Sequence, residues 1–123
     1  MFEQAMRAYY AAYNAEDPAR LTDLLDEHVV LRSSLGEQQG RDAYIATYRY
    51  MIANFIDQME PLEITPKEDG ATVRIADRLT ARQDIADFMG QSLSAGETMT
   101  LDLIGRYRFK DGRIVAIDIA PAP

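Results

Sequence analysis

Residues 9–21 read Tyr-Tyr-Ala-Ala-Tyr-Asn-Ala-Glu-Asp-Pro-Ala-Arg-Leu, and this stretch decides how the chain begins to fold. Upstream of it, apolar residues recur at i, i+3 and i+4 spacing, which predicts an amphipathic helix over 2–15. Asp17 is a favourable N-cap and Pro18 suits the first position of a new helix. The stretch therefore predicts two successive helices. Their apolar faces consist of Phe2, Met6, Tyr9, Tyr10 and Tyr13 in the first and Leu21, Leu24 and Leu25 in the second.

The period changes to two from His28 to Ser33, which predicts a strand with Val29, Leu31 and Ser33 on one face. Residues 36–40 then form a turn, with room for a short paired strand. A third helix is predicted from Arg41 to about Asp57. Its apolar stripe would be Tyr44, Ile45, Tyr48, Ile52, Phe55 and Ile56.

The rest of the chain has the patterns of β-structure. Strands are predicted over 61–66, 71–83, 98–109 and 113–119, and turn signals lie at 68–70 and 110–112. Residues 84–97 have the composition of a loop. Without an internal repeat or linker, residues 1–123 form one α+β domain, in which three helices precede an antiparallel meander.

Composition excludes several classes of function. The formal net charge of −7 would repel a phosphate backbone, so we expect no nucleic-acid partner. The chain has no cysteine and a single histidine, His28, so thiolate nucleophiles and the common zinc sites are absent. No apolar run has the length of a signal peptide or a membrane span, which predicts no membrane association and a cytoplasmic location.

Four segments, in order, resemble the SnoaL-like, nuclear-transport-factor-2-like superfamily, whose fold is also that of ketosteroid isomerases. They are residues 9–21, Gly-Arg-Asp-Ala-Tyr at 40–44, Phe-Met-Gly at 88–90 with Gly96 after it, and Arg-Tyr-Arg-Phe-Lys-Asp-Gly-Arg-Ile-Val at 106–115. The resemblance implies a cone-shaped, curved sheet wrapped around the helices, a pocket at one end, and a homodimer joined through the outer sheet face. Ile104 lies among polar neighbours on that face. The fold hosts isomerases, cyclases, dehydratases, epoxide hydrolases and non-enzymatic modules, so it does not name a reaction.

Asp77 is the most informative single residue, because it is in phase with the apolar face of its strand, which carries Val73, Ile75 and Leu79. A carboxylate there must be paired, protonated, hydrogen-bonded or beside a wet cavity. One interpretation is a pocket general acid or base with a raised pKa. The other is a β-bulge that turns the side chain outward, or a structural hydrogen bond to a helix end.

The resemblance places Tyr9 where ketosteroid isomerases have their oxyanion-stabilising tyrosine, although Tyr9 could equally be a core residue. The two other isomerase positions differ: Ser33 stands at the position of the base and Gly105 at that of the second donor. A serine alone is no carboxylate base and glycine has no side chain. We therefore do not expect an authentic ketosteroid isomerase.

The leading hypothesis is a small-molecule pocket for proton transfer on a hydrophobic carbonyl or enol compound. Asp77 would be the acid or base, and Tyr9, with Ser33 or Tyr48, would polarise the substrate. No cofactor and no metal are expected. The alternative is a non-catalytic binding or dimerisation module. The expected ligand-binding residues are Tyr13, Tyr48, Ile52, Phe55, Ile75, Leu79, Phe88, Leu103 and Tyr107.

Overall fold

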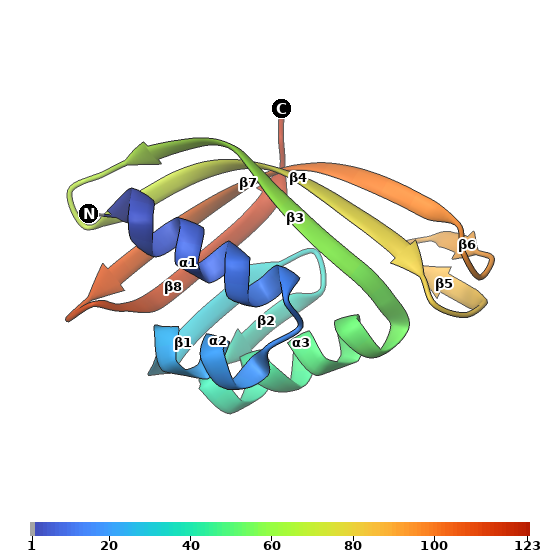
Figure 1. Ribbon diagram of the computed structural model, residues 1–123, viewed down its shortest axis with the longest axis horizontal. Helices are drawn as coiled ribbons and strands as arrows, with labels where there is room; N and C mark the ends of the chain where they lie inside the picture. Colours follow the sequence, from blue (N-terminus) through green and yellow to red (C-terminus); the bar gives the residue numbers. More distant parts are fainter. Residues whose placement is uncertain (1) are drawn as a thin grey trace.

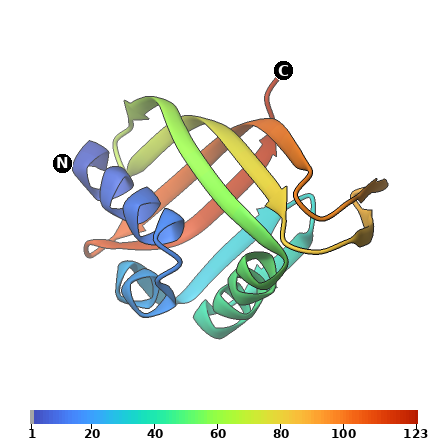
Figure 2. The same ribbon diagram turned by 45° about the vertical axis from the view of Figure 1, so that its right-hand side comes forward.

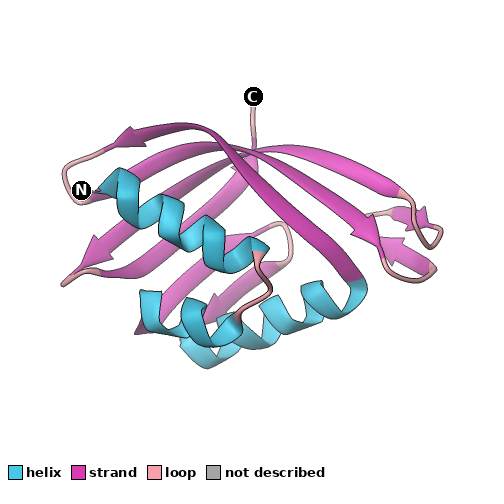
Figure 3. Cartoon of the chain, in the orientation of Figure 1, coloured by secondary structure: helices cyan, strands magenta, loops and turns pink. Residues whose placement is uncertain are grey.

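A computed structural model describes residues 2–123, in which three helices lie against a large sheet (Figures 1 and 3). None of these helices is long and apolar enough to cross a membrane. The elements, in chain order, are α1 (Phe2–Asn14), α2 (Pro18–Leu24), β1 (Leu25–Ser33), β2 (Gly36–Gln39), α3 (Arg41–Asn54), β3 (Phe55–Pro66), β4 (Gly70–Ala81), β5 (Ile85–Phe88), β6 (Gln91–Leu93), β7 (Thr98–Lys110) and β8 (Arg113–Pro121).

The large sheet has the strand order β2-β1-β8-β7-β4-β3. All neighbouring strands are antiparallel except β1 and β8, which are parallel. The sheet curves over the helices, so that its concave face is covered and its convex face is open (Figure 2). This is the predicted α+β cone with three N-terminal helices.

The start of the fold follows the local signals in residues 9–21. The Asp17 side chain accepts a hydrogen bond from the Arg20 backbone N–H at 3.1 Å, and Pro18 opens α2, as predicted. The predicted aromatic face of α1 is buried against the concave face of the sheet. Met6, Tyr9, Tyr10 and Tyr13 are each at most 7% exposed, and with strands β1, β4, β7 and β8 they form the main core.

The prediction for the third helix was wrong at its end. The helix stops at Asn54, and residues 55–57 begin β3 instead of completing another turn. Phe55 and Asp57 are buried whereas Ile56 is 42% exposed, which is the period of a strand. Pairing of Phe55 with Ala81 on β4 outweighs the helical spacing of the apolar residues.

Residues 84–97 also contain more structure than expected. They form a separate antiparallel hairpin, β5–β6, in which Ile85 pairs with Leu93 and Phe88 with Gln91. Phe88 and Leu93 are each 5% exposed because they pack on Phe55 and Leu79 in a second, smaller core. The hairpin projects beyond the end of β4 (Figure 1).

Candidate functional site

A cavity of about 110 Å³ lies between helices α1 and α3 and the concave face of the sheet. Leu35 and Met89 are 42% and 47% exposed, so they mark its open end, between the β1–β2 turn and the β5–β6 hairpin. The wall is mostly aromatic and aliphatic. It consists of Tyr9, Tyr13, Leu31, Ser33, Ser34, Leu35, Tyr44, Thr47, Tyr48, Met51, Asp57, Met59, Asp77, Leu79, Phe88, Met89, Leu101, Leu103, Tyr107, Ile117 and Ile119.

Most of the predicted site residues lie in this wall. Three do not: Ile52, Phe55 and Ile75. Phe55 and Ile75 are fully buried in the core, and Phe55 packs on Phe88 with 4.8 Å between ring centroids. Ile52 is half-buried on α3. The predicted residues that line the cavity are Tyr9, Tyr13, Ser33, Tyr48, Asp77, Leu79, Phe88, Leu103 and Tyr107.

Asp77 points inward, and a second aspartate lies beside it. In the β3–β4 pairing, Asp57 is opposite Leu79 and Asp77 is opposite Met59, so the two aspartates are diagonal neighbours on the inner face. The β3–β4 register is regular here, since the bulge in this pair lies between Pro61 and Glu63. Asp57 is 1% exposed and Asp77 is 4% exposed. The two buried carboxyls therefore form a pair, which we call the Asp57–Asp77 dyad.

Desolvation controls the charge of the dyad. It raises the pKa of Asp77 to about 10, and the hydrogen bond and negative charge of Asp57 add to the rise. The pKa of Asp57 is also raised by burial, but hydrogen bonds from Asp77 and Tyr13 oppose that rise. Two adjacent carboxylates in an apolar site do not both ionise. At neutral pH Asp77 therefore keeps its proton, and Asp57, whose rise in pKa is opposed by two hydrogen bonds, is the carboxyl of the dyad that ionises first.

The end of α1 fixes the position of Asp57. The Tyr13 hydroxyl donates to Asp57 Oδ2 at 2.7 Å. Asn14, the next residue, donates from Nδ2 to the Met59 carbonyl and accepts at Oδ1 from the Met59 N–H, each at 2.8 Å. These two bonds satisfy the backbone of an edge strand and attach α1 to β3. The hydrogen bonds between the end of α1 and β3 thus fix both the carboxylate of Asp57 and the Tyr13 hydroxyl that donates to it.

Apart from Tyr13, the tyrosines of the wall are already hydrogen-bonded to another tyrosine or to the backbone. The Tyr9 and Tyr44 hydroxyls form a short hydrogen bond. The Tyr48 hydroxyl donates to the Tyr13 carbonyl at 2.7 Å, so it is not a free donor. Burial raises the pKa of Tyr9, Tyr44 and Tyr107 well above the usual range, and that of Tyr48 to about 12. All four phenols remain neutral at pH 7.

The carboxylates of the described cavity wall are Asp57 on β3 and Asp77 on β4, and none lies on β1, the strand of Ser33. At the second position, Gly105 is glycine because neighbouring side chains leave no room for a Cβ. A Cβ on Gly105 would lie 2.7 Å from Tyr107 Cε1 and 3.1 Å from the terminal methyl groups of Ile75 and Ile119. The Tyr107 ring therefore occupies the space that a side chain at 105 would need. The site differs from an isomerase triad at both of the expected positions.

Asp57 and Tyr44 are two polar residues of the cavity wall that sequence analysis did not place in the candidate site. Asp57 was assigned to the end of a helix, although the alternation of Phe55, Ile56 and Asp57 carried a strand signal. Tyr44 was assigned to the apolar stripe of α3, and only the folded structure brings its hydroxyl to Tyr9. No grouping of three or more histidine, cysteine, aspartate or glutamate side chains suited to a metal ion occurs among residues 2–123.

The chain resembles solved structures over nearly its whole length. A candidate polyketide cyclase from Xanthomonas campestris pv. campestris has 20% identity and a TM-score of 0.83, with 98% of this chain and 89% of that chain covered. A Catenulispora acidiphila protein with a ketosteroid-isomerase-like fold, solved with trimethylamine, has 11% identity and a TM-score of 0.79, with 97% and 85% covered. An epoxide hydrolase of the limonene-epoxide-hydrolase-like type from M. tuberculosis has 15% identity and a TM-score of 0.77, with 97% and 80% covered.

At these identities the likeness shows a shared fold and leaves the chemistry open. No curated protein matches the chain. The model of the SnoaL-like domain matches residues 6–117, from the buried face of α1 into the last strand. The chain belongs to the SnoaL-like domain family.

Proposed function

We propose that the protein catalyses cofactor-independent proton transfer on a small hydrophobic carbonyl or enol compound, as in an isomerisation, cyclisation or dehydration. The observation that carries the proposal is the Asp57–Asp77 dyad, which faces a cavity that is otherwise apolar and aromatic. A reaction of this class needs a base and an acid close together. The dyad supplies both in the form in which Asp77, with its pKa raised to about 10, keeps its proton and Asp57 acts as the carboxylate.

In an isomerisation, Asp57 removes a proton from the carbon next to the carbonyl group, and the electron pair moves into an enolate. Asp77 then delivers its own proton to another carbon of the same system. The net proton count is unchanged, and one proton transfer between the two carboxyls restores the starting state. Ser33 and the Tyr9–Tyr44 pair are the neutral hydroxyl groups of the wall that stabilise the enolate oxygen.

Cavity size limits the substrate. An engineered apolar cavity of about 150 Å³ accepts a benzene ring, and the cavity here measures about 110 Å³. The cavity is therefore smaller than one that accepts benzene, so it suits a short branched chain or part of a single ring, with the remainder extending past Leu35 and Met89. A four-ring steroid exceeds it.

The proposal is tested with 3-cyclohexen-1-one, a single-ring ketone whose double bond moves into conjugation when a proton is transferred. Conversion is followed by ultraviolet absorbance, and α-deuterium exchange of cyclohexanone is followed by NMR. We expect Asp57→Asn and Asp77→Asn to abolish both activities. Glu63→Gln, an exposed carboxyl on the same strand β3, is the control and should be unchanged. Activity that survives in the double variant Asp57→Asn/Asp77→Asn would refute the proposed role of the dyad.

The alternative is a non-catalytic binding module, which would take up the ketones without exchanging their protons. We further propose a homodimer joined through the convex face of β4 and β7, where half-buried Ile104 lies among exposed polar side chains. The Arg74–Asp102 ion pair, at 2.7 Å, belongs to the same face. Sedimentation at micromolar concentration should give twice the monomer mass of 13.9 kDa.

A further inference from the structure

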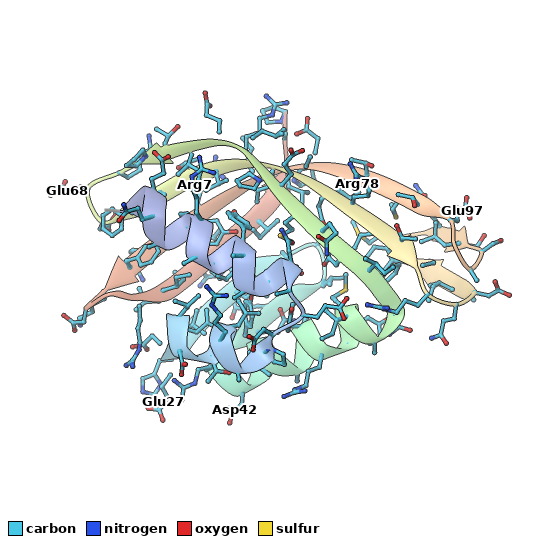
Figure 4. The ribbon with its side chains drawn as sticks, in the orientation of Figure 1. Arg7, Glu27, Asp42, Glu68, Arg78 and Glu97 are labelled. Atoms are coloured by element: carbon cyan, nitrogen blue, oxygen red, sulfur yellow. The ribbon has the colours of Figure 1, made fainter. Side chains whose placement is uncertain are left out.

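The charges around the cavity are unbalanced. Its wall contains two aspartates and no lysine, arginine or histidine. Charged side chains elsewhere point outward, as Figure 4 shows for the six that it labels, Arg7, Glu27, Asp42, Glu68, Arg78 and Glu97. With Asp57 ionised, the dyad holds one negative charge that no cation in the cavity wall compensates. The chain as a whole has a formal net charge of −7.

The dyad also has free hydrogen-bond acceptors but no free donor. Its single proton lies between the two carboxyls, and the Tyr13 hydroxyl occupies Asp57 Oδ2. Asp57 Oδ1 and Asp77 Oδ1 are buried and receive no hydrogen bond from any other described group. What the dyad offers a ligand is therefore lone pairs, which recognise an N–H or O–H donor. In the resting state a carbonyl oxygen, which is only an acceptor, finds no free proton there.

The remaining wall suits a cation with an apolar body. Tyr9, Tyr13, Tyr48, Phe88 and Tyr107 surround the cavity, and the rings of Tyr13 and Tyr48 lie 4.8 Å apart between centroids. Aromatic faces attract ammonium groups through their quadrupole, and the attraction is larger where water is excluded. Thioethers of Met51 and Met59 add soft, adaptable surface.

We propose that the cavity selects a small hydrophobic amine in its protonated form, with the ammonium group hydrogen-bonded to the Asp57–Asp77 dyad and the ring or chain against the aromatic wall. This inference deepens the proposed function and rests on the cavity being its ligand site. One positive charge on the ligand balances the one negative charge of the dyad, which keeps its proton. The substrate class is then an amine-bearing carbonyl compound.

Three probes of nearly the same shape test the charge preference: benzylamine, benzyl alcohol and benzoate. Binding is measured by calorimetry or NMR titration at pH 7, where benzylamine is protonated. We expect benzylamine to bind at least about tenfold more tightly than benzyl alcohol, because a charge pair in a dry site is stronger than a neutral hydrogen bond. We expect no binding of benzoate.

Two matched variants locate the charge that is responsible. Asp57→Asn leaves a neutral pair, so it should remove the preference for benzylamine over benzyl alcohol. Asp77→Asn keeps the negative charge on Asp57, so the preference should remain. Glu63→Gln, outside the cavity, should behave as the wild type.

The outcomes separate this inference from the proposed reaction. Benzyl alcohol binding as tightly as benzylamine, or benzylamine failing to bind at millimolar concentration, overturns the inference, and this ranking needs only the wild-type protein. The ketone exchange assay is independent of that ranking. Tight benzylamine binding without ketone exchange supports the amine site and refutes the proposed catalysis.

Discussion

Replacement of Asp77 by asparagine should stabilise the protein at neutral pH. In the folded chain the pKa of Asp77 is raised from 3.8 to about 10. At pH 7 the folded chain binds this proton and the unfolded chain does not. Folding therefore requires uptake of a proton, which lowers the free energy of unfolding. The pKa of Asp77 in the unfolded chain lies about three units below pH 7, and each unit corresponds to about 1.4 kcal/mol. The proton uptake therefore lowers the free energy of unfolding at pH 7 by about 4 kcal/mol. Asparagine needs no proton to be neutral, and its amide N–H still reaches Asp57.

The sign of the pH dependence follows from the same linkage. A raised pKa contributes stability that is fully present below the unfolded pKa and is lost as pH rises toward the folded pKa. The free energy of unfolding of the wild type should therefore fall by about 1.4 kcal/mol per pH unit between pH 6 and 8. Exposed Glu37 and Asp102 have lowered pKa values, so both are ionised throughout this window and do not contribute to the slope.

Urea denaturation at pH 6, 7 and 8 measures both effects, with wild type and Asp77→Asn compared at each pH. The two curves should converge toward pH 6 and diverge toward pH 8, with the variant the more stable. A wild-type free energy of unfolding that stays constant or rises over this window would refute the account. So would an Asp77→Asn variant with the same slope as the wild type.

Three further variants or assays test the packing and chemistry of the site. Gly105→Ala should cost about 1–3 kcal/mol of stability through overpacking against Tyr107, and an unchanged urea midpoint would contradict this. Tyr13→Phe should cost about 1.5–3 kcal/mol, because it removes a hydrogen bond to the charged Asp57; the exposed Tyr50→Phe is the control. Spectrophotometry with 5-androstene-3,17-dione should detect no more than trace isomerisation, whereas turnover like that of authentic isomerases would contradict the site geometry.

Sequence alone predicted those features that depend on one element at a time. The inward direction of Asp77 followed from the alternation of β4, and its raised pKa from burial among Val73, Ile75 and Leu79. The start of α2 followed from Asp17 and Pro18. Asp57 was missed because Phe55 and Ile56 extend the apolar spacing of α3, and only pairing with β4 turns that segment into a strand.

The interactions between elements could not be read from local patterns. The dyad forms only because β3 pairs with β4 in the register that places Asp57 opposite Leu79. The spacing of residues within either strand does not predict this register. The Tyr9–Tyr44 and Tyr13–Asp57 hydrogen bonds join residues 35 and 44 positions apart. The periodicity of a helix or strand shows which side chains face inward but not which of them reach a cavity. The prediction therefore included three apolar residues that pack around the cavity without lining it, Ile52, Phe55 and Ile75.

The single parallel strand pair has a consequence for the order in which the protein forms. β1 lies beside β8, with Val30 paired to Ala116, so the sheet joins the first strand of the described chain to the last. Contacts so distant in sequence slow folding, because a long loop must close before they form. During synthesis, α1, α2 and β1 emerge long before β8 is available. The concave face of the sheet closes over the helices only when the final strand inserts between β1 and β7. A chain that ends before Arg113 would leave the inner edges of β1 and β7 unpaired and open to association with other chains.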